Sequence, residues 1–255
     1  MSLPNETSPV HMSEFIITGF NHLPNRRFLG CLILTAYLFV LFGSSLNVSI
    51  IASNRRLHTP MYMFICNLAV VDIMFTTSAS TTMIAVLLAN AKTISYYSCI
   101  SKMFVYHFGD ISECFAILLM AVDRMVAISN PLRYHSILTN TRTLGLITAS
   151  WLLGCIAMGF LTRIADGLPY CQPVLPYVFC SYACLIRAAC VNPEEYFFAS
   201  TILSLLVMGS FPCILLTYVK IVYTVLKLSN VASRKQMFAT CVSHNIVVAS
   251  YYTPK

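Results

Sequence analysis

The sequence contains few charged residues. Asp, Glu, Lys and Arg make up only 10% of its 255 residues, whereas 58% are hydrophobic, and the mean hydropathy is +0.75. A soluble domain devotes about a quarter of its residues to charge, because its surface faces water. A chain of this length and composition cannot cover itself with polar groups. We therefore expect its surface to face lipid, which excludes a soluble globular protein.

Charge is absent altogether from four long stretches, residues 28–54, 143–162, 196–219 and 236–254. A helix needs about 20 apolar residues to cross the hydrocarbon core of a membrane. Two further hydrophobic segments, residues 61–88 and 96–128, are also long enough to cross a membrane and contain only scattered charged residues. The expected spans are 28–52, 61–88, 96–128, 143–164, 196–226 and 235–255. None shows the strict alternation of a barrel strand, so the sequence predicts an all-α, multi-spanning transmembrane helix bundle.

The N-terminus also lacks a cleaved signal peptide, because residues 1–13 have neither a basic start nor an apolar stretch. We expect residues 1–27 to form an extracellular leader and residues 28–255 the transmembrane domain. Cytoplasmic loops are rich in Lys and Arg. If the N-terminus is extracellular, most of the basic residues fall in the cytoplasmic loops, so this orientation is expected. Asn5, in the acceptor pattern Asn-Glu-Thr, predicts glycosylation of the leader. The net charge of +7 follows from the inner loops, so nucleic acid is not needed as a partner.

Three acids lie inside predicted spans: Asp72, Asp110 and Glu113. Acids within a membrane are costly and by default mark function. At helical spacing, one stripe of the third span holds Tyr106, Asp110, Glu113, Met120 and Arg124. This stripe covers roughly 21 Å from Asp110 to Arg124, and we expect it to face the bundle interior. From the residues alone the acids are structural, line a cation path of a transporter, or carry a ligand signal inward. No nucleophile–base pair or metal-ligand cluster indicates an enzyme.

Five cysteines fall on the predicted outer side, which is oxidising: Cys99, Cys171, Cys180, Cys184 and Cys190. Two bridges among them are expected, and the residues alone leave the pairing open.

Three motifs, in the right order, carry a family resemblance. Residues 57–64 read LHTPMYMF, residues 120–128 read MAVDRMVAI, and residues 235–244 read KQMFATCVSH. They resemble LHTPMYxFL, MAYDRYVAI and KAFSTCxSH of the odorant receptors, a family of rhodopsin-type G-protein-coupled receptors. The resemblance implies a seven-helix receptor in the plasma membrane that binds a small odorant and activates a stimulatory heterotrimeric G protein.

The resemblance also implies a ligand site in the outer half of the bundle. The matching positions are Tyr106, His107, Asp110, Ile111, Cys114, the stretch from Leu203 to Val207, and Tyr252. An acid in an otherwise apolar cleft favours a cationic or hydrogen-bond-donating ligand, because leaving the acid unpaired is costly.

Further roles follow from the same resemblance. Asp123 and Arg124 match the acid–Arg pair of the G-protein switch, and Tyr218 matches the inner tyrosine of the fifth helix. Asp72 and Glu113 match the acids flanking a buried cation site. Two neighbouring carboxylates cannot both stay ionised without a counter-ion, so a sodium ion or a shared proton is expected there, with a hydrogen-bond network without an ion as the alternative. No other cofactor is expected.

The implied disulfides pair Cys99 with Cys180 and Cys171 with Cys190, which leaves Cys184 over. The chain reaches Lys255 inside the sixth expected span, whereas the family has a seventh helix. We therefore expect six spans, the sixth incomplete, and a chain that by itself signals poorly. The rival hypothesis is a transporter that uses Asp72, Asp110 and Glu113 as a cation or proton relay. Transporters often contain an internal repeat, and no such repeat is visible here.

Overall fold

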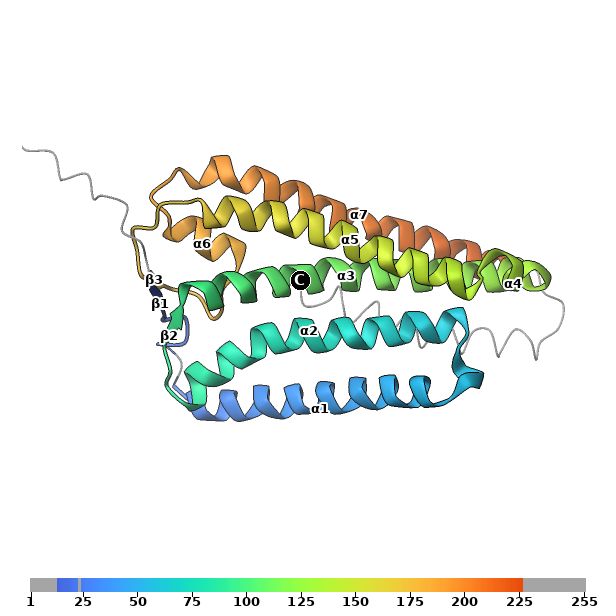
Figure 1. Ribbon diagram of the computed structural model, residues 1–255, viewed down its shortest axis with the longest axis horizontal. Coiled ribbons are helices and arrows are strands. Elements are labelled where there is room, and N and C mark those ends of the chain that lie inside the picture. The colour runs from blue at the N-terminus through green and yellow to red at the C-terminus, as the bar shows by residue number, and fades with distance from the viewer. Residues whose placement is uncertain (1–12, 23, 227–255) are drawn as a thin grey trace, which may run out of the picture.

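Five long helices lie side by side in the computed structural model, which describes residues 13–22 and 24–226 (Figure 1). They are α1 (Arg26–Ser53), α2 (Pro60–Leu88), α3 (Tyr96–Ser129), α5 (Asn140–Asp166) and α7 (Pro193–Leu226). Each begins and ends within one turn of the range expected from the sequence. The sixth expected span, 235–255, lies outside the described residues.

Short elements mark the two ends of this bundle (Figure 1). The outer end, defined by the described N-terminal residues, carries strands β1 (Glu14–Ile17), β2 (Thr93–Ser95) and β3 (Val174–Leu175) and helix α6 (Tyr182–Ala188). The inner end carries the 3-10 helices η1 (Arg55–Leu57) and η2 (Pro131–Arg133) and helix α4 (Tyr134–Ile137).

The outward faces of the long helices are apolar. Helices α1, α2 and α5, and residues Pro193–Thr224 of α7, are long and apolar enough to cross a membrane. Large side chains of α1 stay exposed: Phe28 is 73% exposed, Phe39 72% and Phe42 71%. Soluble monomers rarely expose apolar patches of this kind, whereas hydrocarbon chains of a bilayer cover them favourably. The bundle surface is therefore suited to lipid.

Helix α3 occupies the centre of the bundle and packs against α2, α5 and α7. Its 34 residues extend roughly 51 Å at 1.5 Å per residue. Met103 and Ile117 are fully buried, in clusters that join α3 to α5 in the outer half and to α7 further in. The polar stripe expected on this helix is thus carried by the most enclosed of the five long helices.

Side-chain hydrogen bonds tie the helices together where water is absent. The Trp151 indole N–H donates to Asn67 Oδ1 at 2.8 Å, which joins α5 to α2. The Ser78 hydroxyl of α2 donates to the Lys102 carbonyl of α3 at 2.6 Å. Such groups need a partner within the protein, because hydrocarbon offers none.

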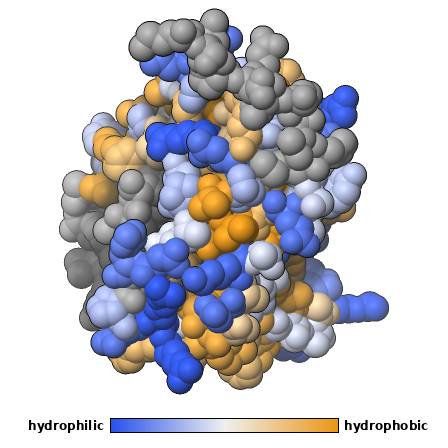
Figure 2. Space-filling view, turned by 90° about the vertical axis from the view of Figure 1, so that its left-hand side faces the viewer, coloured by the Kyte–Doolittle hydropathy of each residue, from blue (hydrophilic) through white to orange (hydrophobic). Residues whose placement is uncertain are grey.

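A three-stranded sheet at the outer end has the order β2-β1-β3. Strand β1 runs antiparallel to β2, with Glu14 opposite Ser95, and parallel to β3, with Ile16 opposite Val174. Its alternate residues Phe15 and Ile17 are buried. Figure 2 looks onto this end and shows polar residues around a hydrophobic patch. Part of the segment expected as a leader is therefore the central strand of a folded cap.

Both expected disulfides are present in the cap. Cys99, at the start of α3, is bonded to Cys180, and Cys171 is bonded to Cys190; the Cα atoms are 5.4 Å apart in each pair. Bridges that close long loops contribute a few kcal/mol by restricting the unfolded chain. They also fix α6 over the outer end of α3.

The close packing of Gly19 against Tyr177 in the cap can be tested by substitution. The Gly19 N–H donates to the Tyr177 carbonyl at 3.2 Å, and a Cβ atom at this position would stand 2.4 Å from the Tyr177 carbonyl carbon. We expect Gly19→Ala to destabilise the protein by about 1–3 kcal/mol, because the backbone must shift to admit the methyl group. The check is the thermal unfolding midpoint in detergent micelles.

The matched control is Gly43→Ala, where an added Cβ would meet no atom within 4 Å. A helical Gly→Ala change without a clash stabilises by roughly 0.5–1 kcal/mol. Equal unfolding midpoints for the two variants would contradict the close approach of Gly19 to Tyr177.

Candidate functional site

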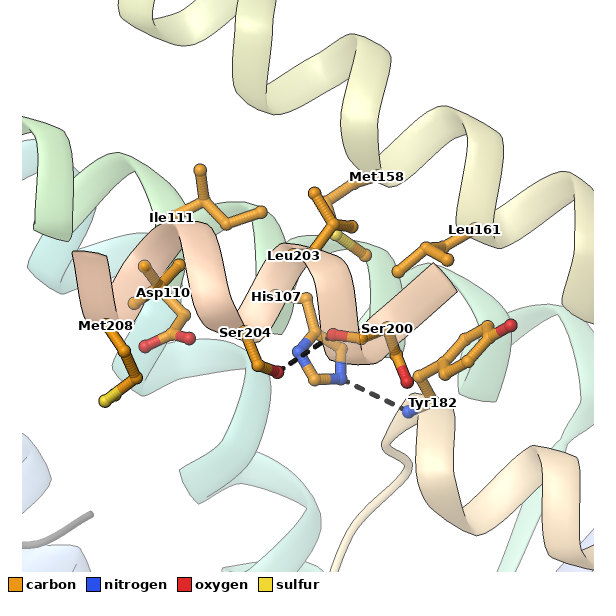
Figure 3. Close-up of a pocket in the computed structure, with 11 residues that line it drawn as sticks. His107, Asp110, Ile111, Met158, Leu161, Tyr182, Ser200, Leu203, Ser204 and Met208 are labelled. Atoms are coloured by element: carbon orange, nitrogen blue, oxygen red, sulfur yellow. Dashed lines mark hydrogen bonds between the residues drawn. The ribbon is translucent and has the colours of Figure 1, made fainter. Parts of the chain in front are cut away.

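A cavity of about 180 Å³ lies in the outer half of the bundle, between α3, α5, α6 and α7 (Figure 3). It is lined by His107, Asp110, Ile111, Met158, Leu161, Tyr182, Ser200, Leu203, Ser204, Val207 and Met208. The lining residues of α3 and those of α7 recur three or four positions apart, so each set lies on one face of its helix. The cavity therefore combines a mostly apolar lining with a few convergent polar groups, as small-molecule sites do.

His107 connects the cavity to the cap. Its Nε2 accepts a hydrogen bond from the Tyr182 backbone N–H at 3.2 Å (Figure 3). Accepting this bond requires a lone pair on Nε2, so the bonded ring is neutral and carries its proton on Nδ1. The Tyr182 hydroxyl donates to the Tyr196 carbonyl at 3.2 Å. Helix α6 is thus attached to both α3 and α7 above the cavity.

The serines on α7 present acceptor oxygens to the cavity. The Ser200 hydroxyl donates to the Phe197 carbonyl and the Ser204 hydroxyl to the Ser200 carbonyl, both at 2.9 Å. Because each hydroxyl proton is used within the helix, the lone pairs of each oxygen remain to accept a bond. Together with the Asp110 carboxyl group, this polar wall is suited to a ligand that donates hydrogen bonds.

A second cavity of about 300 Å³ adjoins the first and shares Ile111, Leu203 and Val207 with it. The remaining lining residues are Cys114, Phe115, Leu153, Ala157 and Ser210. Combined, the two spaces fall in the size range of small-molecule pockets, about 300–1,000 Å³. The adjoining space gives an apolar extension to the polar outer cavity.

The structure brings most of the expected ligand residues together. His107, Asp110, Ile111, Leu203 and Val207 line the first cavity, and Cys114 lines the second. Tyr106 stands outside both sets, because its ring packs against Phe75 at 4.8 Å and Phe179 at 4.6 Å between centroids. Tyr252 lies outside the described residues.

Five lining residues were not anticipated: Met158, Leu161, Tyr182, Ser200 and Met208. Helical spacing from Leu203 and Val207 could have found those on α7. The residues of α5 and α6 carry no comparable signal, because only the folded outer loop brings them to α3.

The expected switch lies at the inner end of α3. Asp123 is 2% exposed, and its Oδ2 lies 3.7 Å from Arg124 Nε. The Tyr134 hydroxyl of α4 donates to Asp123 Oδ1 at 2.7 Å, a partner not anticipated from the sequence. Burial, and then this hydrogen bond, raise the pKa of Tyr134, so its hydroxyl keeps the proton at neutral pH. The acid is therefore held by α3 and the inner loop together.

Tyr218 of α7 packs beside this switch. It contacts the cluster around Ile221 together with Met125 and Ile128 of α3. The inner halves of α3 and α7 are thus joined by apolar contacts next to Arg124.

The convergence of Asp72 and Glu113 stays a prediction. Both side chains are half-buried, and the backbone carbonyl of Asp72 accepts from the Thr76 hydroxyl at 2.6 Å. Among residues 13–22 and 24–226, no three His, Cys, Asp or Glu side chains are grouped to hold a metal ion. The expected glycosylation site, Asn5, lies outside the described residues.

Comparison with known proteins gives a consistent result. The sequence profile described as "Olfactory receptor" matches residues 31–255. Olfactory receptor 10D1B of Mus musculus is 36% identical over 246 residues, which is 95% of this chain and 79% of that protein. Olfactory receptor 10G4 of Homo sapiens is 33% identical over 247 residues, with the same coverage. Olfactory receptor 11A1 of Homo sapiens is 33% identical over 99% of this chain and 79% of that protein. None of these matches supports the transporter hypothesis.

The leftover Cys184 generates a prediction about the cap. Its side chain is 1% exposed, and burial raises its pKa to about 12. Because the thiolate is the reactive form, we expect native Cys184 to resist maleimide at pH 7. Its labelling rate should rise roughly tenfold per pH unit below pH 12, as the thiolate fraction grows. Peptide mapping by mass spectrometry measures the labelling.

The matched control is Arg187→Cys, which places a thiol on the exposed side of the same helix α6. That thiol should react within minutes at pH 7, and Cys184 should react only after denaturation. Equal labelling of the two positions in the native protein would contradict the buried position of Cys184.

Proposed function

The chain belongs to the olfactory receptor family, and from this membership we propose that a small hydrogen-bond-donating odorant in the outer cavity activates a stimulatory G protein through it. As a member of this family, the protein is an odorant-sensing G-protein-coupled receptor of the plasma membrane and not an enzyme. Coupling to the stimulatory class of G protein and the chemistry of the ligand are the proposed parts.

The acceptor character of the outer cavity supports the ligand class. Asp110, Ser200 and Ser204 line the cavity, and because both serine hydroxyls donate their protons within α7, their oxygens are left able to accept a bond from a ligand. Met158, Leu161 and Ile111 supply apolar walls on the other sides. A ligand with an apolar body and one amine or hydroxyl group would complement both the acceptor oxygens and the apolar walls.

Two helices connect this cavity to the inner end. Helix α3 carries both Asp110 and Arg124, which are separated by roughly 21 Å along the helix axis. Helix α7 carries the cavity serines and Tyr218. Between them, Pro212 cannot donate the usual helical hydrogen bond, so α7 has a weak point at which its two halves can move. We propose that the ligand signal passes along this pair.

Activation requires a difference in affinity. An odorant shifts the equilibrium between resting and active states only if it binds the active state more tightly. In the structure, Tyr134 and Arg124 hold Asp123 at the inner end, and we propose that this arrangement belongs to the resting state. We propose that the active state frees Arg124 for the G protein, and that a sodium ion or shared proton between Asp72 and Glu113 favours the resting state.

The ligand class can be tested with Asp110→Asn. We expect the unaltered receptor to respond at lower concentrations to an amine or alcohol than to the methyl ether of the same skeleton. In the variant, the ratio of amine potency to ether potency should fall about tenfold, because hydrogen bonds to charged groups contribute about 1.5–3 kcal/mol. Concentration–response curves in a cell-based reporter assay measure the effect.

Thr201→Val is the matched control for this experiment, because Thr201 is exposed and its hydroxyl donates to the Phe197 carbonyl outside the cavity. Its curves should match those of the unaltered receptor. An Asp110→Asn variant that kept the full amine preference would overturn the proposed role of the acid.

The G-protein class can be tested by cyclic AMP accumulation. Because the chain spans 79% of the length of its relatives, we would compare it with a version extended by the last span of such a relative. The extended receptor should raise cyclic AMP in response to an odorant panel, and Arg124→Ala should abolish the rise while leaving surface expression intact.

Two results would count against this proposal. They are an Arg124→Ala variant that signals normally, and cation transport at the cell surface without G-protein activation. The last result would favour the transporter hypothesis instead.

A further inference from the structure

A second site lies in a groove between α2 and α3, away from the cavity proposed for odorants. The groove has a volume of about 420 Å³ and is lined by Ile73, Met74, Thr77, Ser78, Thr81, Ser98, Ser101, Lys102 and Val105. It shares no residue with the two cavities described above. Its occupant therefore has to be identified from its own chemistry.

Most of the groove lining is apolar, and Lys102 and several hydroxyl-bearing residues lie toward one end. Helix α2 runs outward and α3 runs inward, so Thr81, Ser98, Ser101 and Lys102 lie toward the outer end. Ile73 lies deeper by eight residues, or roughly 12 Å along α2. Hydroxyl groups and a cation thus stand where the headgroups of a membrane begin, and apolar side chains stand where the acyl chains lie. This gradient matches an amphiphile with its head outward.

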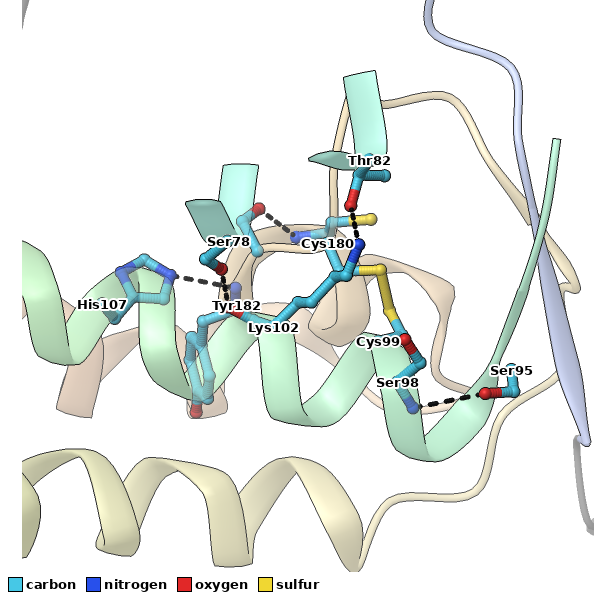
Figure 4. Close-up of a disulfide and its surroundings, with 11 residues drawn as sticks. Ser78, Thr82, Ser95, Ser98, Cys99, Lys102, His107, Cys180 and Tyr182 are labelled. Atoms are coloured by element: carbon cyan, nitrogen blue, oxygen red, sulfur yellow. Dashed lines mark hydrogen bonds between the residues drawn. A yellow bond between two sulfur atoms is a disulfide. The ribbon is translucent and has the colours of Figure 1, made fainter. Parts of the chain in front are cut away.

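The ammonium group of Lys102 favours an amphiphile whose headgroup is negatively charged. Its Nζ donates to Thr82 Oγ1 at 2.8 Å and to Thr81 Oγ1 at 3.1 Å (Figure 4). An ammonium group has three hydrogen-bond donors, so one remains beyond these two neutral partners. Within the described part of the chain, neither ion pair involves Lys102. A cation in a membrane segment without an opposite charge is costly, and an anionic ligand would remove that cost.

The position of Lys102 is fixed rather than adaptable. It stands one turn after Cys99, which the disulfide to Cys180 anchors to the outer loop (Figure 4). The carbonyl of Lys102 also accepts the Ser78 hydroxyl at 2.6 Å, which holds α2 against α3 at this level. The two hydroxyls and the ammonium are thus preorganised, which lowers the cost of ordering a bound ligand.

We propose that this groove binds a long-chain fatty acid from the outer leaflet, with its carboxylate on Lys102 and its chain between α2 and α3. A carboxylate supplies one negative charge and two acceptor oxygens, which matches one ammonium group surrounded by hydroxyls. With a volume of about 420 Å³, the groove is closer in size to a single acyl chain than to a two-chain phospholipid. The site does not depend on odorant binding or on G-protein coupling, so its test gives a result whether or not the proposed function is correct.

The test is photo-crosslinking of the full 255-residue chain in nanodiscs of phosphatidylcholine. The probe is a long-chain fatty acid that carries a diazirine, and its methyl ester is the neutral counterpart. We expect the acid to label residues 73–81 and 98–105, and the ester to label them about tenfold less. Oleate should compete with the probe, whereas methyl oleate should not.

Variants of Lys102 test the charge directly. Lys102→Met keeps the length of the side chain and should reduce labelling about tenfold, whereas Lys102→Arg should retain it. Lys92→Met removes another outer lysine, one that contacts Asn21 outside the groove, and should leave labelling unchanged. The Cys99–Cys180 bridge, quantified in the same digest, reports whether each variant keeps a folded outer end.

Several outcomes would overturn the proposal. Equal labelling by the methyl ester would show that the groove takes apolar chains without regard to charge, and this comparison needs no variant. Competition by phosphatidylglycerol as strong as that by oleate would assign the groove to a phospholipid. Labelling mapped to other segments, or lost equally in Lys92→Met, would remove the site.

Discussion

Hydrocarbon offers no hydrogen-bond partner, so a polar group of this chain that lies within a membrane is costly unless it finds one inside the protein. This constraint explains why the backbone forms long helices and why α3, which carries the most charged residues of them, stands at the centre, between α2, α5 and α7. It also explains the bonds from Trp151 to Asn67 and from Ser78 to the Lys102 carbonyl. The apolar outward faces follow from the same condition.

The outer end obeys a different condition, because water is present there. Strand β1 is held between two strands from distant loops, and two disulfides fix the loop that carries α6. Helix α6 in turn reaches His107 and Tyr196 through Tyr182. The cavity is therefore bounded partly by lipid-embedded helices and partly by a covalently fixed cap. A ligand must be small and must enter past that cap or between helices.

Much of the fold could be predicted from the sequence, since the absence of charge over 20 or more residues leaves few alternatives to a membrane helix. The disulfide pairing came only from the family resemblance, because five outer cysteines allow several arrangements. The strand Glu14–Ile17 could not be predicted, because its partners are remote residues 93–95 and 174–175. The bond from Tyr134 to Asp123 could not be predicted either, because it depends on the turn through η2.

The central claim is that an odorant is recognised between α3 and α7 beneath α6. The most direct measurement is a cryo-electron microscopy structure of the receptor, extended as described above, bound to an activating odorant and a G protein. The account predicts ligand density in contact with Asp110 and the serines Ser200 and Ser204, and Arg124 turned toward the G protein. Ligand density confined to another part of the bundle, with the outer cavity empty in the active complex, would contradict it.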